Sequence, residues 1–145
     1  MKIKTFTLRD LLRRTSFLII LAMGAESSNV MAGWTLVDVN DDSSVFSDLS
    51  TIRKDGNLVK MWVLYDFQKV KQLAGVNSQS YKALYQFNCQ EEMARTVGLF
   101  YYSKHMGSGN ISFSNSDISE WRLVIPDTVG HRLWSDACNK SWRNN

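Results

Sequence analysis

The chain has 145 residues, a length that is typical of one domain. Its 17 basic and 14 acidic side chains give a formal charge of +3, but the first 32 residues contain five of the basic and only two of the acidic ones. The remainder, with twelve of each, is formally neutral, which argues against a general nucleic-acid binder. Because no G-x-S-x-G, H-E-x-x-H or C-x-x-C motif occurs, the sequence offers no catalytic, cofactor-binding or metal-binding residue.

The beginning of the chain has the three-part layout of a secretory signal. A basic stretch precedes the apolar run "FLIILAMGA" at 17–25, and Val30 and Ala32 are small residues spaced as signal peptidase requires. As a helix the apolar run rises only about 14 Å, whereas a bilayer core needs about 20 residues, so no stable membrane span is expected. No cysteine directly follows the run, so we expect no lipid anchor. We expect a cleaved signal peptide over 1–32 and a single domain over 33–145, exported to the periplasm or secreted to the cell surface.

Alternation of apolar and polar residues predicts antiparallel strands in the first part of this domain. The segment "WTLVDV" at 34–39 opens as a strand, and 45–53 indicates a second, weaker strand. Asp55 and Gly56 in "KDGN" occupy the positions of a tight hairpin that need a positive φ. The next strand, over 58–67, has one apolar and one amphipathic face, as in a half-buried antiparallel sheet. Its apolar face consists of Val59, Met61, Val63, Tyr65 and Phe67.

The alternation is interrupted and then returns. The Gly, Asn and Ser content of "QKVKQLAGVNSQS" at 68–80 predicts a loop. A strand over 81–89 follows and places Cys89 on the same face as its apolar row. A further strand over 93–104 contains Gly98, which indicates a bulge or a bend. The remaining elements predicted before the end of the domain are a turn at 105–110, a strand at 111–113, a polar loop and a strand at 121–125.

The period changes near the end of the chain, where a helix is predicted. Pro126 and Asp127 form a helix-start signal, in which Asp127 caps free backbone N–H groups. Over 127–139 the apolar residues fill one half of a helical wheel, which predicts a helix packed against the sheet. Cys138 lies on this apolar half, so both cysteines are predicted to face the contact between helix and sheet.

The two cysteines of the chain are interpreted as one disulfide. In an exported protein, two lone cysteines are most simply paired with each other. A catalytic pair of His131 and Cys138 fails because seven helical residues separate them by about 10.5 Å along the axis, well beyond the roughly 3 Å of proton transfer. His105 could approach Cys138 through the fold, but Cys89 would then be unexplained, and a zinc site needs three or four ligands. We therefore predict a disulfide between Cys89 and Cys138.

Together these elements predict an α+β fold that is mostly antiparallel β. About six strands form a curved antiparallel sheet, and one C-terminal helix is tethered to its concave face by the disulfide. The aromatic residues of the strands are interpreted as core or as cover of the sheet, and His131 as a boundary residue beside the bridge. Binding residues are therefore unassigned. The aromatic residues concerned are Trp62, Tyr101, Tyr102 and Trp121.

Several motifs in order carry a family resemblance. They are Trp34 at the first strand, the hairpin "TIRKDGNLVKMWVLYDF", the strand "SYKALYQFNC", Arg95, "YYSKHMGSG" and the ending "WRLVIPDTVGHRLWSDAC". With both cysteines in place, residues 34–138 resemble the surface-adhesin protein E family of exported bacterial proteins. The resemblance implies a curved antiparallel sheet with a disulfide-held C-terminal helix. It also implies non-catalytic binding of host matrix and serum proteins, with a homodimer possible.

The expected function is therefore binding rather than catalysis. We expect an adhesion or binding protein of the cell envelope whose partner is a host matrix or envelope protein, and no nucleic acid or cofactor. The alternative is a periplasmic inhibitor or assembly factor that acts on another envelope protein. An enzyme would have to combine His105 or His131 with Asp127 or Asp136 and a serine, and no motif supports that combination.

Overall fold

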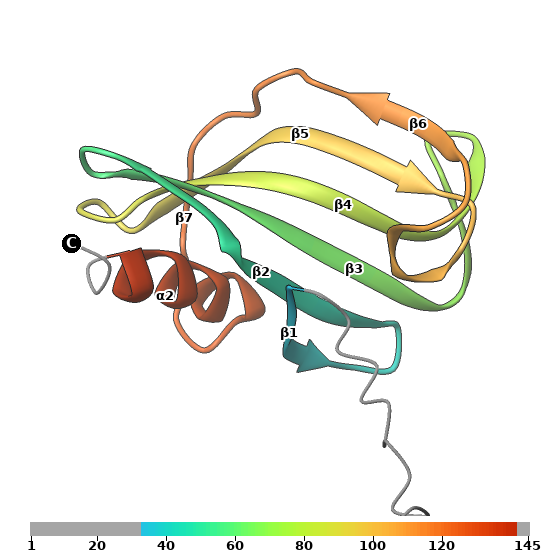
Figure 1. Ribbon diagram of the computed structural model, residues 1–145, viewed down its shortest axis with the longest axis horizontal. Helices are drawn as coiled ribbons and strands as arrows, with labels where there is room; N and C mark the ends of the chain where they lie inside the picture. Colours follow the sequence, from blue (N-terminus) through green and yellow to red (C-terminus); the bar gives the residue numbers. More distant parts are fainter. Residues whose placement is uncertain (1–32, 142–145) are drawn as a thin grey trace, which may run out of the picture. The chain divides into compact units, whose positions relative to one another are not determined.

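The computed structural model describes residues 33–141 of the chain, and the predicted signal peptide over 1–32 lies outside this part. The described residues form seven strands, a short 3-10 helix η2 (His105–Gly107) and one α-helix, α2 (Val129–Ser141) (Figure 1). The strands are β1 (Trp34–Val39), β2 (Ser43–Asp55), β3 (Leu58–Leu73), β4 (Val76–Asn88), β5 (Met93–Tyr102), β6 (Ile111–Asn115) and β7 (Arg122–Leu123).

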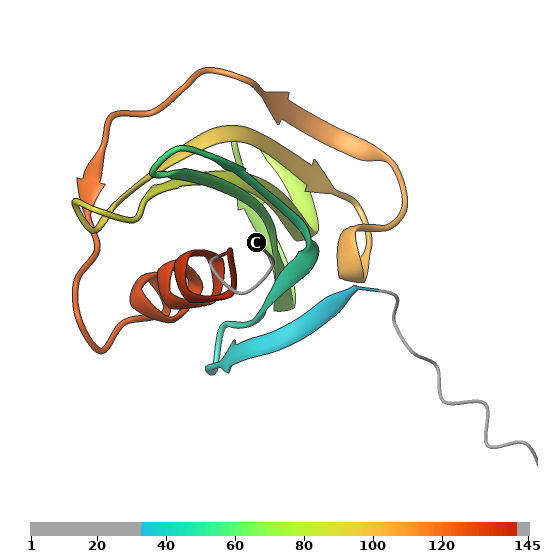
Figure 2. The ribbon, with the colours of Figure 1, turned by 60° about the vertical axis from the view of Figure 1, so that its left-hand side comes forward.

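All seven strands belong to one antiparallel sheet. Its order, β1-β2-β3-β4-β5-β6, follows the chain, and β7 pairs with the beginning of β5. The sheet is open and curves strongly around α2, which lies on its concave side (Figure 2). The predicted α+β class, with a curved antiparallel sheet and one C-terminal helix on the concave face, is confirmed.

The core lies between the concave face and α2. Alternate residues of β3, among them Val59, Met61 and Val63, are almost completely buried, as their period-2 pattern predicts. From the helix side, Leu133 and Ala137 fill the space above them, since they lie one turn apart on one face of α2. The sheet therefore buries one of its faces against a single helix.

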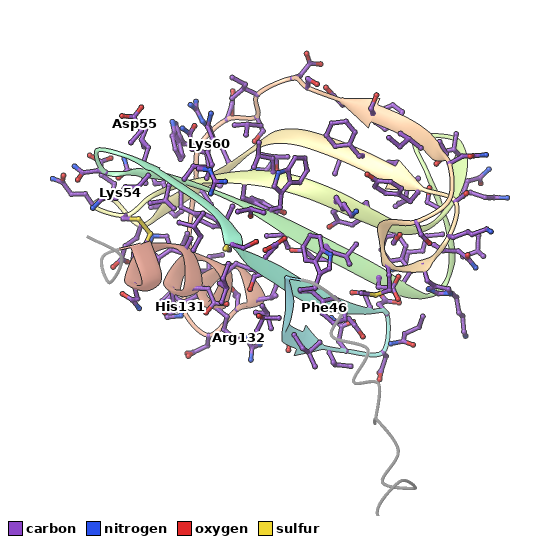
Figure 3. The ribbon with its side chains drawn as sticks, in the orientation of Figure 1. Phe46, Lys54, Asp55, Lys60, His131 and Arg132 are labelled. Carbon is purple, nitrogen blue, oxygen red and sulfur yellow. A yellow bond between two sulfur atoms is a disulfide. The ribbon has the colours of Figure 1, made fainter. Side chains whose placement is uncertain are left out.

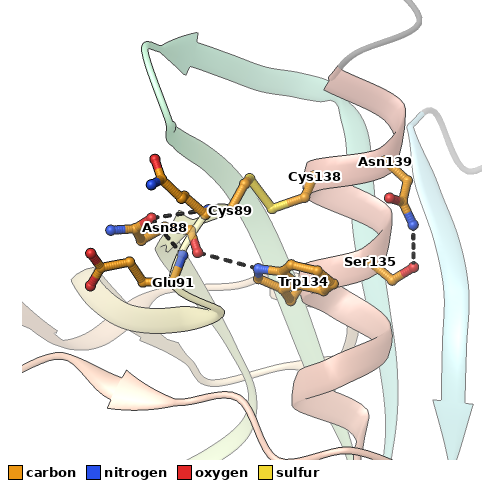
Figure 4. The surroundings of a disulfide bond; sticks show 8 residues. Asn88, Cys89, Glu91, Trp134, Ser135, Cys138 and Asn139 are labelled. Atoms are coloured by element: carbon orange, nitrogen blue, oxygen red, sulfur yellow. Dashed lines mark hydrogen bonds between the residues drawn. A yellow bond between two sulfur atoms is a disulfide. The ribbon is translucent and has the colours of Figure 1, made fainter.

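The predicted disulfide joins this helix to the sheet. Cys89 follows the end of β4, and its Cα lies 5.6 Å from that of Cys138 in α2 (Figure 4). Near the bridge, the indole Nε1–H of Trp134 donates to the backbone oxygen of Asn88 at 3.4 Å. The helix is thus fixed to the sheet by a covalent bond, by apolar packing and by a polar contact.

The segment 68–80 is not a loop, and this expectation was wrong. β3 continues to Leu73 and β4 begins at Val76, so that a long hairpin projects from the sheet. The connecting residues Ala74 and Gly75 both have positive φ, 50° and 79°, as a two-residue turn of type I′ requires. The polar composition suggested a loop because these strand ends bury few side chains, but ladder hydrogen bonds between neighbouring strands do not depend on an apolar face.

The other local features agree with the predictions in part. Gly98 does lie at a bulge in β5. Leu84 of β4 pairs with Gly98, but the next residue, Tyr85, pairs with Thr96, so that one residue of β5 has no partner on β4. In the β2–β3 turn only Gly56 has a positive φ, 57°, and Asp55 ends the strand. The strand predicted at 121–125 is reduced to the two residues of β7.

The cap of α2 is Thr128 rather than Asp127. The backbone N–H of His131 donates to Oγ1 of Thr128 at 3.3 Å, the contact expected between an N-cap side chain and the third helical residue. Asp127 has a φ of 61° and is exposed in the turn before the helix. The predicted helix start is therefore one residue too early, because Thr128 offers the same capping chemistry.

Candidate functional site

The concave face extends beyond α2 and forms an open groove. The middle of this groove has a volume of about 490 Å³, and residues of β3, β4 and β5 line it. A cavity of about 400 Å³ adjoins it beside the start of α2 and shares Tyr85, Thr96 and Ser119 with it. A third cavity, of about 440 Å³, extends the groove to the β1–β2 turn and shares Phe67, Lys71 and Tyr81 with the middle cavity. The three cavities together are called the concave groove below.

A ladder of aromatic rings crosses the floor of the concave groove. Tyr65, Tyr81, Tyr101 and Phe113 are direct partners on β3, β4, β5 and β6. Consecutive ring centroids along this row lie 4.5, 5.8 and 5.3 Å apart, and the first pair is stacked. The ladder arises from strand register, since residues that directly face each other across antiparallel strands project from the same side. We call these four residues the aromatic ladder.

The aromatic ladder is neutral at physiological pH. Burial raises the pKa of Tyr65 and Tyr81 well above the ordinary value for tyrosine, and the neighbouring tyrosines raise it further. The phenol groups therefore keep their protons and can donate hydrogen bonds while their rings offer apolar surface. Such a surface suits contact with a partner that is itself partly apolar.

Charged groups mark the two ends of the concave groove. At the end near the β1–β2 turn, Nζ of Lys71 lies 3.3 Å from Oδ2 of Asp42 and 5.1 Å from the centroid of the Phe67 ring. At the other end, beside the start of α2, the exposed Arg122 and the cap residue Thr128 line the cavity. The groove thus combines an apolar floor with a few polar groups near its ends, and ligand-binding clefts usually have such a mostly apolar lining with a few polar groups.

The residues considered for catalysis do not meet in the groove. Nδ1 of His105 lies 3.2 Å from Oδ2 of Asp66 in an exposed contact, and Asp66 also accepts a hydrogen bond from the backbone N–H of Met106. His131 stacks on Trp134 at 5.8 Å, on the helix (Figure 3 labels His131). Asp136 accepts a hydrogen bond from the Ser47 hydroxyl at 3.1 Å. Within residues 33–141, no three His, Cys, Asp or Glu side chains are grouped so that they could hold a metal ion.

The aromatic residues singled out in the sequence divide between the two faces of the sheet. Tyr101 belongs to the aromatic ladder, whereas Trp62 and Trp121 lie on the convex face, where Trp62 contacts Phe100 and Trp121 contacts Arg95. The sequence pattern places Tyr65 and Tyr81 on apolar faces, but it does not show that α2 leaves this part of the face open. The groove was therefore missed because its openness depends on the position of a distant helix.

Solved structures of other proteins have a similar architecture. Crystal form II of Haemophilus influenzae protein E aligns with a TM-score of 0.61 at 16% identity, covering 81% of this chain and 95% of that one. Protein E from non-typeable Haemophilus influenzae aligns with a TM-score of 0.60 at 15% identity, covering 83% and 84%. These similarities concern the fold. No curated protein sequence matches the chain. In the described part of the chain, no helix is long and apolar enough to cross a membrane.

The sequence match to a family covers nearly all of the described residues. The family described as "Surface-adhesin protein E" matches residues 34–139, from the start of β1 to within α2. The matched region includes both disulfide cysteines and every strand of the sheet. The chain therefore belongs to the surface-adhesin protein E family.

Proposed function

We propose that the protein is a non-catalytic binding or adhesion protein of the bacterial cell envelope that holds a segment of another protein in the concave groove. The partner is a host matrix protein or an envelope protein. Export by a cleaved signal peptide over 1–32, leaving the domain 33–145 in the periplasm or at the cell surface, belongs to the same proposal. The membership in a family of surface adhesins supports it.

The observation that carries the proposal is the aromatic ladder, which α2 does not cover and which stays partly exposed. Tyr65, Tyr81 and Tyr101 are only partly buried, although they continue the face that α2 covers elsewhere. Rigid aromatic side chains with a polar hydroxyl provide large contact areas at low entropic cost, and they are enriched in protein interfaces. A groove of three connected cavities suits an extended segment better than a compact small molecule.

Binding to immobilised proteins tests this function. The purified domain is passed over a panel of extracellular matrix proteins and, separately, over periplasmic extract from the producing bacterium. We expect binding to at least one component with micromolar or tighter affinity. Leu99→Gln, which places an amide in the groove wall, should weaken that binding at least about tenfold, since it removes apolar contact area and buries a polar group.

A matched control separates loss of the groove from loss of the fold. Leu36→Gln makes the same chemical change at a site on β1 that is 55% exposed and outside the concave groove. It should leave binding unchanged. Equal loss in both variants, or no binding to any component, would contradict the proposal. Binding only to periplasmic components would favour the inhibitor or assembly role over adhesion to the host.

A further inference from the structure

The convex face of the sheet carries a line of positive side chains from three strands. Arg53 on β2 is the direct partner of Lys60 on β3, Lys60 is the partner of Gln86 on β4, and Gln86 is the partner of Arg95 on β5. Lys60 stands between two core residues of β3 and therefore projects from the opposite face, away from α2 (Figure 3). We call Arg53, Lys60 and Arg95 the basic row.

The positive charges of the basic row are not neutralised within the described part of the chain. Among residues 33–141, none of the three forms an ion pair. Nη1 of Arg53 donates to backbone oxygens, at 2.8 Å to that of Ile52. Nε and Nη2 of Arg95 donate to Oε1 of Gln86 at 2.8 and 2.7 Å. Both guanidinium groups are thus oriented by neutral hydrogen-bond partners.

This arrangement works against the stability of the sheet. Like charges at directly opposite positions of two antiparallel strands repel each other, and Arg53 and Lys60 are such a pair. Two acidic residues share this face, and neither forms an ion pair with the basic row: the carboxylate of Asp48 accepts a hydrogen bond from the Ser50 hydroxyl at 2.6 Å, and Asp55 ends β2 without a described ion pair. An external anion would relieve this repulsion.

Aromatic and apolar side chains also lie beside the basic row. The guanidinium of Arg95 lies 4.3 Å from the centroid of the Trp121 ring, and Trp62 is half-buried two residues from Lys60. Leu123 on β7 is 71% exposed and pairs with Met93, two residues from Arg95, which places it on the convex side of this sheet edge, where it also borders the groove cavity beside α2. A convex surface cannot enclose a small molecule, so its partner must present an extended surface of its own.

We propose that the basic row binds the surface of a bilayer rich in anionic, phosphate-bearing lipids. Lysine and arginine side chains near an anionic bilayer are attracted to its lipid phosphates, and tryptophan and leucine side chains favour the interface beside them. This inference is separate from the proposed function, because Arg53 and Lys60 line no cavity of the concave groove; of the basic row, only Arg95 borders that groove, beside the start of α2. The protein could therefore rest on a membrane and keep its groove free for a partner.

Vesicle binding tests the inference. The first 32 residues contain five basic side chains that would bind anionic vesicles by themselves. The test therefore uses the disulfide-bonded chain from residue 33 to 145, which contains the whole sheet and core and lies within one compact unit. Vesicles of phosphatidylglycerol and phosphatidylcholine are compared with vesicles of phosphatidylcholine alone by co-sedimentation. We expect binding to the anionic vesicles only, weakened by salt.

Two variants and one matched control locate the interaction. Lys60→Gln should weaken partitioning to anionic vesicles about fivefold, the effect of one basic residue near an anionic surface. It should not lower stability toward urea, because it also removes the repulsion with Arg53. Lys69→Gln, the same change at another exposed position of β3, is the matched control and should bind like the original chain. Leu123→Gln should reduce the binding that remains at high salt.

Three outcomes would overturn the inference. The first is failure of the original chain to bind anionic vesicles at low salt. The second is an equal loss of binding in Lys60→Gln and Lys69→Gln, which would indicate a general effect of net charge. The third is binding to soluble polyglutamate without binding to vesicles, which would assign the basic row to an acidic protein.

Discussion

The disulfide is expected to supply a large share of the stability of this domain. Cys89 and Cys138 are 49 residues apart in the sequence, and closing a loop of this length removes conformational entropy from the unfolded chain. For a loop of this size the chain-entropy relation gives about 4 kcal/mol at 25 °C. A domain of this size has a total free energy of unfolding of about 5–15 kcal/mol, so the bridge is a substantial part of it.

The double variant Cys89→Ala/Cys138→Ala tests this magnitude. Alanine is chosen over serine because Cys138 is 2% exposed, so that serine would bury a hydroxyl in the apolar core. We expect the free energy of unfolding to fall by about 4 kcal/mol and the melting temperature to fall on the order of 15 °C. The measurement is urea unfolding followed by circular dichroism, with thermal melts alongside. The original chain in reductant should behave in the same way.

The expected folded state of the variant keeps α2 on the sheet. Leu133 and Ala137 remain buried against the concave face, and Trp134 still reaches Asn88. A loss smaller than about 1 kcal/mol would refute the reasoning, since the bridge would then not restrict the unfolded chain. Titration of the untreated native protein should find no reactive thiol, because both cysteines are bonded.

Two further predictions concern the aromatic ladder and the β3–β4 hairpin. Because burial raises the pKa of Tyr65 and Tyr81, both stay protonated in the folded state while the unfolded chain ionises above about pH 10. The contribution of these tyrosines to the free energy of unfolding should be full below about pH 10 and fall above it by at most about 1.4 kcal/mol per pH unit for each tyrosine. In urea unfolding, the variant Tyr65→Phe/Tyr81→Phe should show a flatter dependence of this free energy on pH. Ala74→Asn should raise the free energy of unfolding by about 0.5–1 kcal/mol, since asparagine tolerates the positive φ of a type I′ turn better than alanine does. Gly75→Ala should lower it by about 1 kcal/mol, and the opposite order of these two variants in urea unfolding would contradict the assigned turn.

Local patterns in the sequence were sufficient for most of the fold. The alternation over 58–67 identified the buried face of β3, because a strand with one covered face must alternate between apolar and polar residues. The placements of Cys89 on a strand face and of Cys138 on a helix face were obtained separately and agreed. Both depended only on fixed periods of 2 and 3.6 residues.

Features that bury few side chains could not be predicted from the periodicity of apolar residues. The hairpin around Ala74 is polar and extends past the core, so its strands are held by backbone pairing with their neighbours and leave no apolar pattern. Aspartate is the more strongly preferred capping residue of Asp127 and Thr128, and only the backbone conformation shows that Thr128 is the cap.

The two candidate binding surfaces depend on contacts between distant segments. The sequence by itself determined that Tyr65 and Tyr81 lie on apolar strand faces, because side-chain alternation is a local property. It could not determine that the register of four strands aligns them into one ladder, or that α2 stops short of covering it. The same holds for Arg53, Lys60 and Arg95, which form a row only because β2, β3, β4 and β5 pair in one register. Strand register and helix position are set by the packing of the whole domain, so they appear only in the tertiary structure.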